Sequence, residues 1–88
     1  MSYRIPRHVH ARAIHDEVVV LDTQSDAYLG LNRTGSVIWQ VVSQGGSEDE
    51  AVEALLDRFA VAREIALADV TNLVADLVTR GLLEPEST

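Results

Sequence analysis

The segment at residues 28–39, YLGLNRTGSVIW, constrains the fold more than any other part of the chain. Its first part alternates like a strand, and its second part has the apolar spacing of a helix. Asn32 or Thr34 can accept hydrogen bonds from the free N–H groups that begin such a helix. The segment therefore predicts a strand that runs directly into a helix. Few side chains of this strand can do chemistry, so its backbone edge is the candidate for function.

Two further runs before this segment have strand character. The expected strands are residues 9–14, 17–22 and 27–31. Val9, Ala11 and Ala13 alternate with polar residues, which predicts a half-buried first strand. The second strand is rich in β-branched residues, and short polar turns separate all three. We expect an antiparallel meander, preceded at residues 1–8 by a loosely held lead-in.

Three helices are expected after the meander. The first should end at Gly45-Gly46, and Ser47 with Glu50 forms the capping box of the second, which runs to about Phe59. The third should run from about Arg63 to Arg80 and stop at Gly81. Its expected core stripe is Leu67, Val70, Val74, Leu77 and Val78. Leu82 and Leu83 should anchor the chain before a polar tail at residues 84–88. The order is βββααα, an α+β fold in one domain (residues 1–88, with an ordered core at about 9–83).

Composition excludes several kinds of chemistry. The chain has no cysteine and no lysine, and its net charge is −7. Thiolate zinc sites, cysteine nucleophiles and Schiff bases are thus absent, and the acidic balance disfavours nucleic acid. His8, His10 and His15 lack carboxylate or cysteine partners at ligand spacing. We expect no enzyme activity, catalytic residue, metal, cofactor or membrane contact, and a cytoplasmic location.

The third expected strand, residues 27–31, contains none of the charged residues or prolines that protect an exposed sheet edge. If it is an edge, its backbone can pair with an extended peptide. On the third helix, Leu73 with Val70 and Leu77 below it can line a pocket for an apolar side chain. Asp69, Asp76 and Arg80 can recognise charged side chains of the peptide along the rim of this pocket. The alternative is a core stripe with a solvated flank, in which Asp76 and Arg80 simply pair.

These features resemble the PqqD family of peptide-recognition elements from ribosomal peptide pathways. The resemblance covers about residues 9–83, and the following residues carry it: Leu21-Asp22, Tyr28 to Asn32, Thr34-Gly35, Ile38-Trp39, Gly45-Gly46, Asp69-Val70, Leu73, Leu77 and Gly81 to Leu83. The small stand-alone form looks most like the B1 proteins of lasso-peptide clusters. Gln44-Gly45-Gly46 stands where the PqqD proteins of the quinone-cofactor pathway usually carry an aspartate-glycine pair.

The resemblance implies a winged helix-turn-helix-like domain that binds the leader of a precursor peptide. The leader adds as a strand beside the third strand, in a groove walled by the third helix. The implied site is Ala27, Tyr28, Leu29, Gly30, Leu31, Asp69, Val70, Leu73, Asp76, Leu77 and Arg80. The implied partners are the precursor peptide, a leader protease of B2 type and a macrolactam-forming cyclase. The alternatives are a winged-helix DNA-binding regulator, a PqqD-type chaperone for a peptide modified by a radical-SAM enzyme, and a small metal-dependent hydrolase or isomerase.

Overall fold

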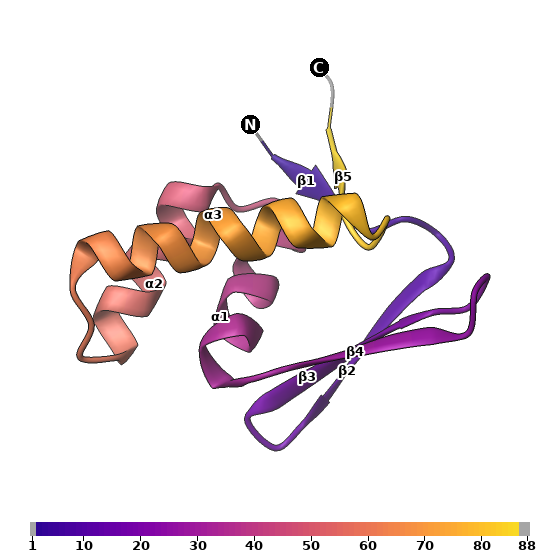
Figure 1. The fold of residues 1–88 in the computed structure, drawn as a ribbon, viewed down its shortest axis with the longest axis horizontal. Helices are drawn as coiled ribbons and strands as arrows, with labels where there is room; N and C mark the ends of the chain where they lie inside the picture. Colours follow the sequence, from indigo (N-terminus) through magenta and orange to yellow (C-terminus); the bar gives the residue numbers. More distant parts are fainter. Residues whose placement is uncertain (1, 87–88) are drawn as a thin grey trace.

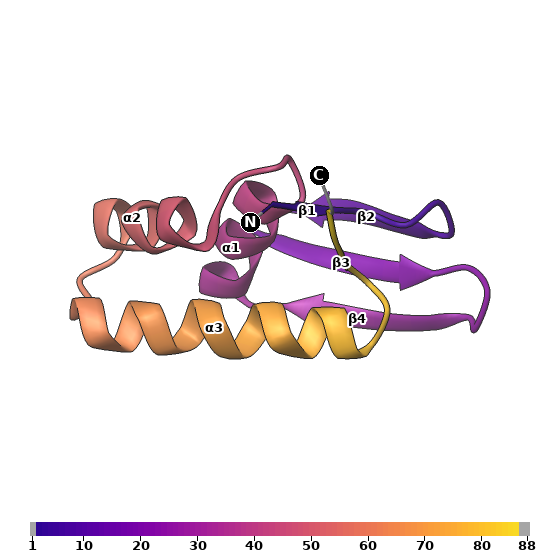
Figure 2. The same cartoon turned by 90° about the horizontal axis from the view of Figure 1, so that it is seen from above.

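The structure is a computed structural model and describes residues 2–86. Its strands are β1 (Tyr3–Arg4), β2 (Val9–Ile14), β3 (Glu17–Asp22), β4 (Ala27–Leu31) and β5 (Glu84–Pro85). Its helices are α1 (Arg33–Val42), α2 (Glu48–Arg58) and α3 (Arg63–Thr79). The main sheet has the order β2-β3-β4, all antiparallel, with α1 against β3 and β4 (Figures 1 and 2). The predicted α+β fold, a three-stranded antiparallel sheet followed by three helices, is confirmed.

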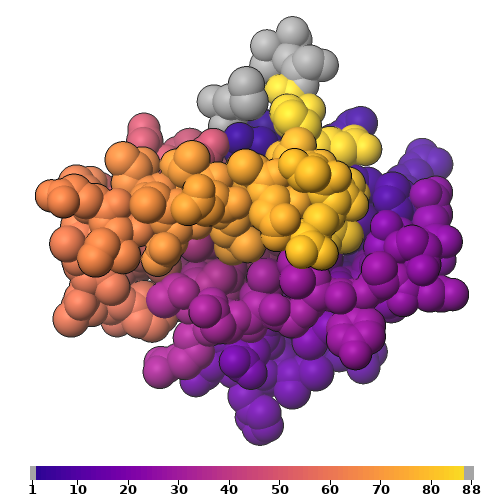
Figure 3. All heavy atoms as spheres, in the orientation of Figure 1, coloured from indigo at the N-terminus to yellow at the C-terminus, as the bar shows by residue number. Residues whose placement is uncertain are grey.

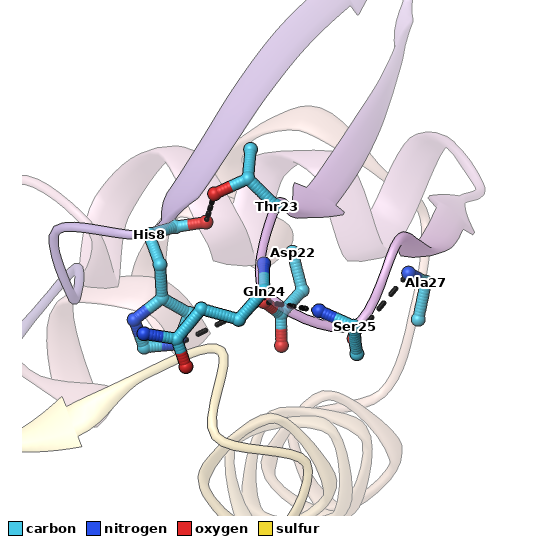
Figure 4. Close-up of polar contacts among 6 residues, drawn as sticks. All are labelled: His8, Asp22, Thr23, Gln24, Ser25 and Ala27. Carbon is cyan, nitrogen blue, oxygen red and sulfur yellow. Dashed lines mark hydrogen bonds and ion pairs between the residues drawn. The ribbon is translucent and has the colours of Figure 1, made fainter.

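Short turns join the three strands of the meander. The turn between β2 and β3 has only two residues, and His15 takes a left-handed conformation (φ 59°). In the turn between β3 and β4, Asp22 Oδ1 accepts hydrogen bonds from the N–H groups of Gln24 (2.9 Å) and Ser25 (3.4 Å) (Figure 4). Burial opposes ionisation of the Asp22 carboxyl, but these hydrogen bonds outweigh it and lower its pKa. The ionised side chain thus holds the hairpin that places β4.

The junction between β4 and α1 is held by two side chains. Asn32 is the N-cap of α1, and its Oδ1 accepts from the N–H of Gly35 (2.8 Å). Ser36, only 2% exposed, accepts a hydrogen bond from the N–H of Val18 in β3 (2.8 Å) and donates to the carbonyl of Asn32 (2.7 Å). The Leu31 carbonyl lies 3.3 Å from the same hydroxyl oxygen. One buried hydroxyl therefore connects β3, the end of β4 and the first turn of α1.

The predicted boundaries of α2 and α3 are confirmed to within one residue, whereas α1 ends at Val42, ahead of the predicted stop at Gly45-Gly46. Ser47 and Glu50 form both bonds of the capping box, at 3.0 and 3.1 Å. Gly81 adopts φ +77°, and the Leu82 N–H bonds the Leu77 carbonyl (2.9 Å), which closes α3 with a Schellman turn. The chain leaves α1 through Gly46, where an added Cβ would lie 2.6 Å from Val41.

Two predictions about burial were wrong. Leu67 is 49% exposed, and Ala66 (0% exposed) takes its place in the core, because α3 turns its Ala66–Val70–Leu77 face inward. Of the inward residues of β2, only Val9 is buried, while Ala11 and Ala13 are exposed. The helix over the sheet packs on β3 and β4 and leaves β2 largely uncovered.

The prediction that residues 1–8 form a loosely held N-terminal segment was also wrong. Within residues 2–86, β1 pairs with β5, so that Tyr3 lies opposite Pro85 and the first and last strands run side by side (Figure 1). Tyr3 is buried in the core, and its hydroxyl donates to Glu48 Oε2 (2.8 Å). The last residues of the expected polar tail, 87 and 88, lie outside the described residues. In the part of the chain that the structure describes, no helix is long and apolar enough to cross a membrane.

Replacement of Ser36 by alanine should destabilise the fold. It leaves the buried Val18 N–H without an acceptor, which costs about 1–3 kcal/mol. Urea unfolding of Ser36→Ala should show this loss. Ser43→Ala is the matched control, since no hydrogen bond of the Ser43 hydroxyl is present among residues 2–86. The free energy of unfolding of Ser43→Ala should stay within about 0.5 kcal/mol of the wild-type value. Equal losses in the two variants would contradict the assigned role of Ser36.

Stability should fall in alkaline solution through Tyr3. Burial, and then the hydrogen bond and charge of Glu48, raise the pKa of the Tyr3 hydroxyl above 10. The folded state holds this proton more tightly than the unfolded state. The contribution of the Tyr3 hydroxyl to the free energy of unfolding is therefore fully present below pH 10 and is lost as pH rises through the raised pKa. Few other groups titrate there, because the chain has no lysine or cysteine. Unfolding at successive pH values should show a steeper alkaline loss for wild type than for Tyr3→Phe. Parallel curves would refute this origin.

Candidate functional site

Strand β4 is an edge of the main sheet, as predicted. Val18 and Leu31 face each other across β3 and β4, and both bond the Ser36 hydroxyl between the strands. In an antiparallel pair, successive residues direct their backbone groups alternately to one side and the other. Leu29, opposite Val20, therefore also faces β3. The N–H and C=O groups of Tyr28 and Gly30 consequently point to the free edge, where they can pair with another strand.

A groove of ≈ 530 Å³ lies between β4 and α3. The atoms of α3 meet those of β4 and of the start of α1 along one face of the molecule (Figure 3). The lining residues come from β4, the start of α1 and the middle of α3: Leu29, Gly30, Leu31, Asn32, Thr34, Gly35, Ile38, Asp69, Asn72, Leu73 and Asp76. The free backbone edge and the groove thus share strand β4, and an extended segment paired with β4 would lie next to α3 (Figure 2).

The structure places the predicted side chains of α3 in two groups. Asp69, Leu73 and Asp76 line the groove. Val70 and Leu77 are fully buried (0% exposed) and do not line it. The expectation that these two residues help to form the pocket is therefore corrected: they support Leu73 from the core, because the inward face of α3 passes through them.

The other predicted residues lie around the groove. Arg80 stands on the rim, and its Nε bonds Asp76 Oδ2 at 3.0 Å, so this pair has the simple surface pairing that the spacing allows. Leu29, Gly30 and Leu31 line the groove, whereas Ala27 and Tyr28 do not. Tyr28 points to the opposite face of the sheet and is 76% exposed.

The sequence analysis missed Asn72 and the groove residues that follow β4 in the chain. Asn72 completes a face with Asp69, Leu73 and Asp76, at helical positions i, i+3, i+4 and i+7. That spacing was visible in the sequence. The sequence analysis considered Asn32 and Thr34 as caps of the first helix and named Gly35 only among the residues that carry the family resemblance. The structure retains that role, since Asn32 Oδ1 bonds Gly35 N–H and Thr34 Oγ1, and adds these residues to the wall.

The groove is apolar at its base and acidic on the α3 side. Leu29, Leu31 and Leu73 supply apolar surface beside the β4 edge. Asp76 is neutralised by Arg80, but no arginine or histidine within residues 2–86 lies within 4.0 Å of the Asp69 carboxylate. The groove therefore suits an extended segment with an apolar side chain and a neutral or basic neighbour. In the same residues, no cluster of three or more histidine or carboxylate side chains is arranged to hold a metal ion.

Comparison with known proteins agrees with this arrangement. The family model described as "Coenzyme PQQ synthesis protein D (PqqD)" matches residues 17–83. This range takes in β3, β4, all three helices and both walls of the groove. The chain therefore belongs to the PqqD family. No curated protein matches it in sequence.

Two solved structures are similar over nearly the whole chain. "TbiB1 in Complex with the TbiA(beta) Leader Peptide" is 32% identical, with a TM-score of 0.85, and the match covers 97% of this chain and 99% of that one. "Lasso peptide synthetase B1 complexed with the leader peptide" is 27% identical, with a TM-score of 0.86, and the match covers 97% and 100%. Both similar proteins were therefore solved with a leader peptide bound.

Proline substitutions should test which backbone groups of β4 are free. Gly30→Pro removes an N–H that faces the edge, and there is open space around Gly30. Leu29→Pro removes an N–H that bonds β3. The free energy of unfolding lost in Leu29→Ala is first subtracted from that lost in Leu29→Pro, to remove the effect of the side chain. The remaining loss should exceed that of Gly30→Pro by at least about 1 kcal/mol. Urea unfolding provides the values. The reverse order would show that the assignment of the free edge is wrong.

Proposed function

We propose that this protein binds the leader region of a ribosomally made precursor peptide and presents it to processing enzymes of lasso-peptide biosynthesis. The observation that carries the proposal is the unprotected edge of β4 beside a groove of ≈ 530 Å³. The two similar structures, each with a leader peptide, support the identity of the guest. The protein itself supplies recognition and no bond-making step.

The leader adds to the sheet as a strand beside β4. Its backbone pairs with the N–H and C=O groups of Tyr28 and Gly30, which gives register and part of the affinity. Successive side chains of a strand alternate between the two faces of a sheet. Those on the α3 side enter the groove, where Leu73 contacts an apolar side chain and Asp69 attracts a basic or polar neighbour.

Roles within the proposed site follow from position. Ala27 to Leu31 form the template strand, Leu73 with Asp69 and Asp76 forms the facing wall, and Arg80 orders Asp76 on the rim. Val70 and Leu77 act indirectly, by holding Leu73 in place from the core. A backbone ladder with a few side-chain contacts is consistent with nanomolar to low-micromolar binding, about −8 to −12 kcal/mol.

The charge distribution disfavours a DNA-binding role. The candidate recognition element, helix α3 with its C-cap (residues 63–80), carries two arginines against three acids, and both arginines are paired with carboxylates. DNA-binding domains concentrate basic residues on the face that meets the duplex. Among PqqD-type roles, the lasso-peptide role has the stronger support, because one of the similar structures is a lasso peptide synthetase B1. We propose a leader protease and a macrolactam-forming cyclase as the enzymes that receive the peptide.

Leu73→Glu should weaken leader binding while the fold is retained. It places a carboxylate beside Asp69 and Asp76 and removes the apolar contact, so affinity for a fluorescently labelled leader should fall at least about tenfold, or 1.4 kcal/mol. Fluorescence anisotropy provides the measurement. Leu67→Glu is the matched control, because Leu67 lies on α3 but outside the groove and is already exposed. Its affinity should match that of wild type.

Two outcomes would contradict the proposed function. One is equal leader affinity for wild type and Leu73→Glu, which would remove α3 from the binding site. The other is tight binding of a DNA duplex at low salt by a protein that does not bind the leader. Gly30→Pro gives an independent check, because its ring occupies the edge and should also reduce leader binding.

A further inference from the structure

A second, smaller hollow lies beside the start of α1. It has a volume of ≈ 170 Å³ and is formed by the β2–β3 turn, the first part of α1 and the end of α2. The polar and aromatic side chains that line it are His15, Asp16, Arg33, Gln40, Arg58 and Phe59, and we call it the turn hollow. It shares no lining residue with the groove beside β4, so the two sites are separate.

Positive charge gathers in the turn hollow of an otherwise acidic protein. Two arginines and His15 line it against a single carboxylate, that of Asp16. Two arginines minus one aspartate give the hollow a charge of +1 with His15 neutral, and +2 with His15 protonated, whereas the whole chain carries −7. The turn hollow therefore attracts an anion that the rest of the surface, taken together, repels.

The two arginines of the turn hollow have free donor groups. Arg4, Arg63 and Arg80 each donate a hydrogen bond to a carboxylate, at 3.0, 2.7 and 3.0 Å. Within residues 2–86, neither Arg33 nor Arg58 donates a side-chain hydrogen bond, and no carboxylate lies within 4.0 Å of Arg58. Each guanidinium group thus offers its planar set of N–H donors to the oxygen atoms of a ligand.

Arg33 is held at the turn hollow from two sides. Its guanidinium carbon lies 5.8 Å from the centre of the Phe59 ring, which is within the range of a cation–π contact. Asp16 Oδ2 lies 3.9 Å from Arg33 Nε, which is too long for a hydrogen bond. The side chains of this ion pair are 68% and 79% exposed, so the pair contributes little. An anion can therefore bind Arg33 without breaking a strong bond.

The position of Arg33 and the size of the turn hollow both favour a small anion. Arg33 is the first residue of α1, where the helix dipole disfavours a cation, and the first turn contains no acid that would offset this. Sites for drug-sized ligands have volumes of about 300–1,000 Å³, so ≈ 170 Å³ is too small for a nucleotide. One carboxylate or phosphate group with a few water molecules fits this volume, since each water occupies about 30 Å³.

We propose that the turn hollow binds one oxyanion group, a carboxylate or a phosphate, through the guanidinium groups of Arg33 and Arg58. A guanidinium group binds such a group with two parallel N–H···O bonds, which are stronger than bonds between neutral partners. The side-chain amide of Gln40 supplies a further donor at the same hollow. The site lies outside the proposed leader groove and does not depend on it.

The oxyanion group can come from a free ion or from an acidic side chain of the bound leader. In the chain, Arg33 stands between Asn32 and Thr34, which both line the leader groove. A leader that continues past Leu31 meets the start of α1, and a helix is about 10–12 Å across. About three or four extended residues, at about 3.3 Å each, span that distance. This second source rests on the proposed function.

Titration of the leader-free protein with sodium phosphate, and separately with sodium acetate, tests the site at constant ionic strength. Nitrogen–proton correlation NMR spectra should show saturable shifts at His15, Asp16 and Arg33. Arg58→Ala should weaken phosphate binding at least about fivefold. Arg12→Ala is the matched control, because it removes the same charge from an exposed arginine outside the turn hollow, and it should bind phosphate like wild type.

Asp16→Asn gives a test in the opposite direction. It removes the one carboxylate of the turn hollow, so phosphate affinity should rise at least about twofold through loss of repulsion. A purely structural role of Asp16 would not increase the affinity. The side chains replaced in these variants are exposed, so each variant should keep the fold.

Leader binding, measured by fluorescence anisotropy, identifies the source of the oxyanion. If the leader supplies it, Arg58→Ala should weaken leader binding at least about fivefold, Arg12→Ala should leave it unchanged, and phosphate should compete with the leader. Equal leader affinity for wild type and Arg58→Ala, together with weaker phosphate binding by Arg58→Ala, would assign the site to a free ion.

Three outcomes would overturn the oxyanion site. They are the absence of saturable shifts in wild type, equal phosphate affinity of Arg58→Ala and Arg12→Ala, and weaker phosphate binding by Asp16→Asn than by wild type. A wild-type protein that binds phosphate at the turn hollow but binds no leader would overturn the proposed function and support the oxyanion site. The two proposals can therefore fail independently.

Discussion

The position of strand β4 depends on one buried hydroxyl. Ser36 stands in the first turns of α1 and bonds the Val18 N–H of β3 at 2.8 Å and the Asn32 carbonyl at 2.7 Å. A buried N–H without a partner is costly, so this bond couples formation of α1 to pairing of the sheet. The hydroxyl lies between Val18 and Leu31, which are partners in the antiparallel register that sets the alternation of backbone groups along β4. The outward direction of the Tyr28 and Gly30 backbone groups follows from that alternation.

The sheet has two edges, and the chain treats them differently. β2 carries Arg12 and His10, and charged side chains discourage pairing with other strands. β4 carries no charged residue, and α3 lies along it at a distance that leaves a groove of ≈ 530 Å³. An unprotected edge is a liability for a soluble protein unless a partner uses it. The same strand borders the groove through Leu29 to Leu31 and exposes Tyr28 on the other face of the sheet.

Local signals in the sequence predicted much of this architecture. The cap at Asn32, the capping box at Ser47 and the stop at Gly81 are confirmed, because each depends on interactions within a few residues. Predictions of burial succeeded less well. Leu67 is hydrophobic and lies near the core stripe of α3, yet Ala66 is buried instead. The helical rotation that decides between them is set by packing against α2, which the periodicity of α3 alone does not contain.

The sequence by itself determined the element order, the strand that lacks edge protection and the absence of cysteine and lysine chemistry, because these depend on residue type and short-range spacing. Only the tertiary structure decided which residues of α3 face β4. Asn72 lines the groove, whereas Val70 and Leu77 are buried in the core. The tertiary structure also paired β1 with β5 and buried Tyr3 against Glu48. These contacts join residues 45 or more positions apart, and their existence depends on how the helices stack rather than on any local pattern.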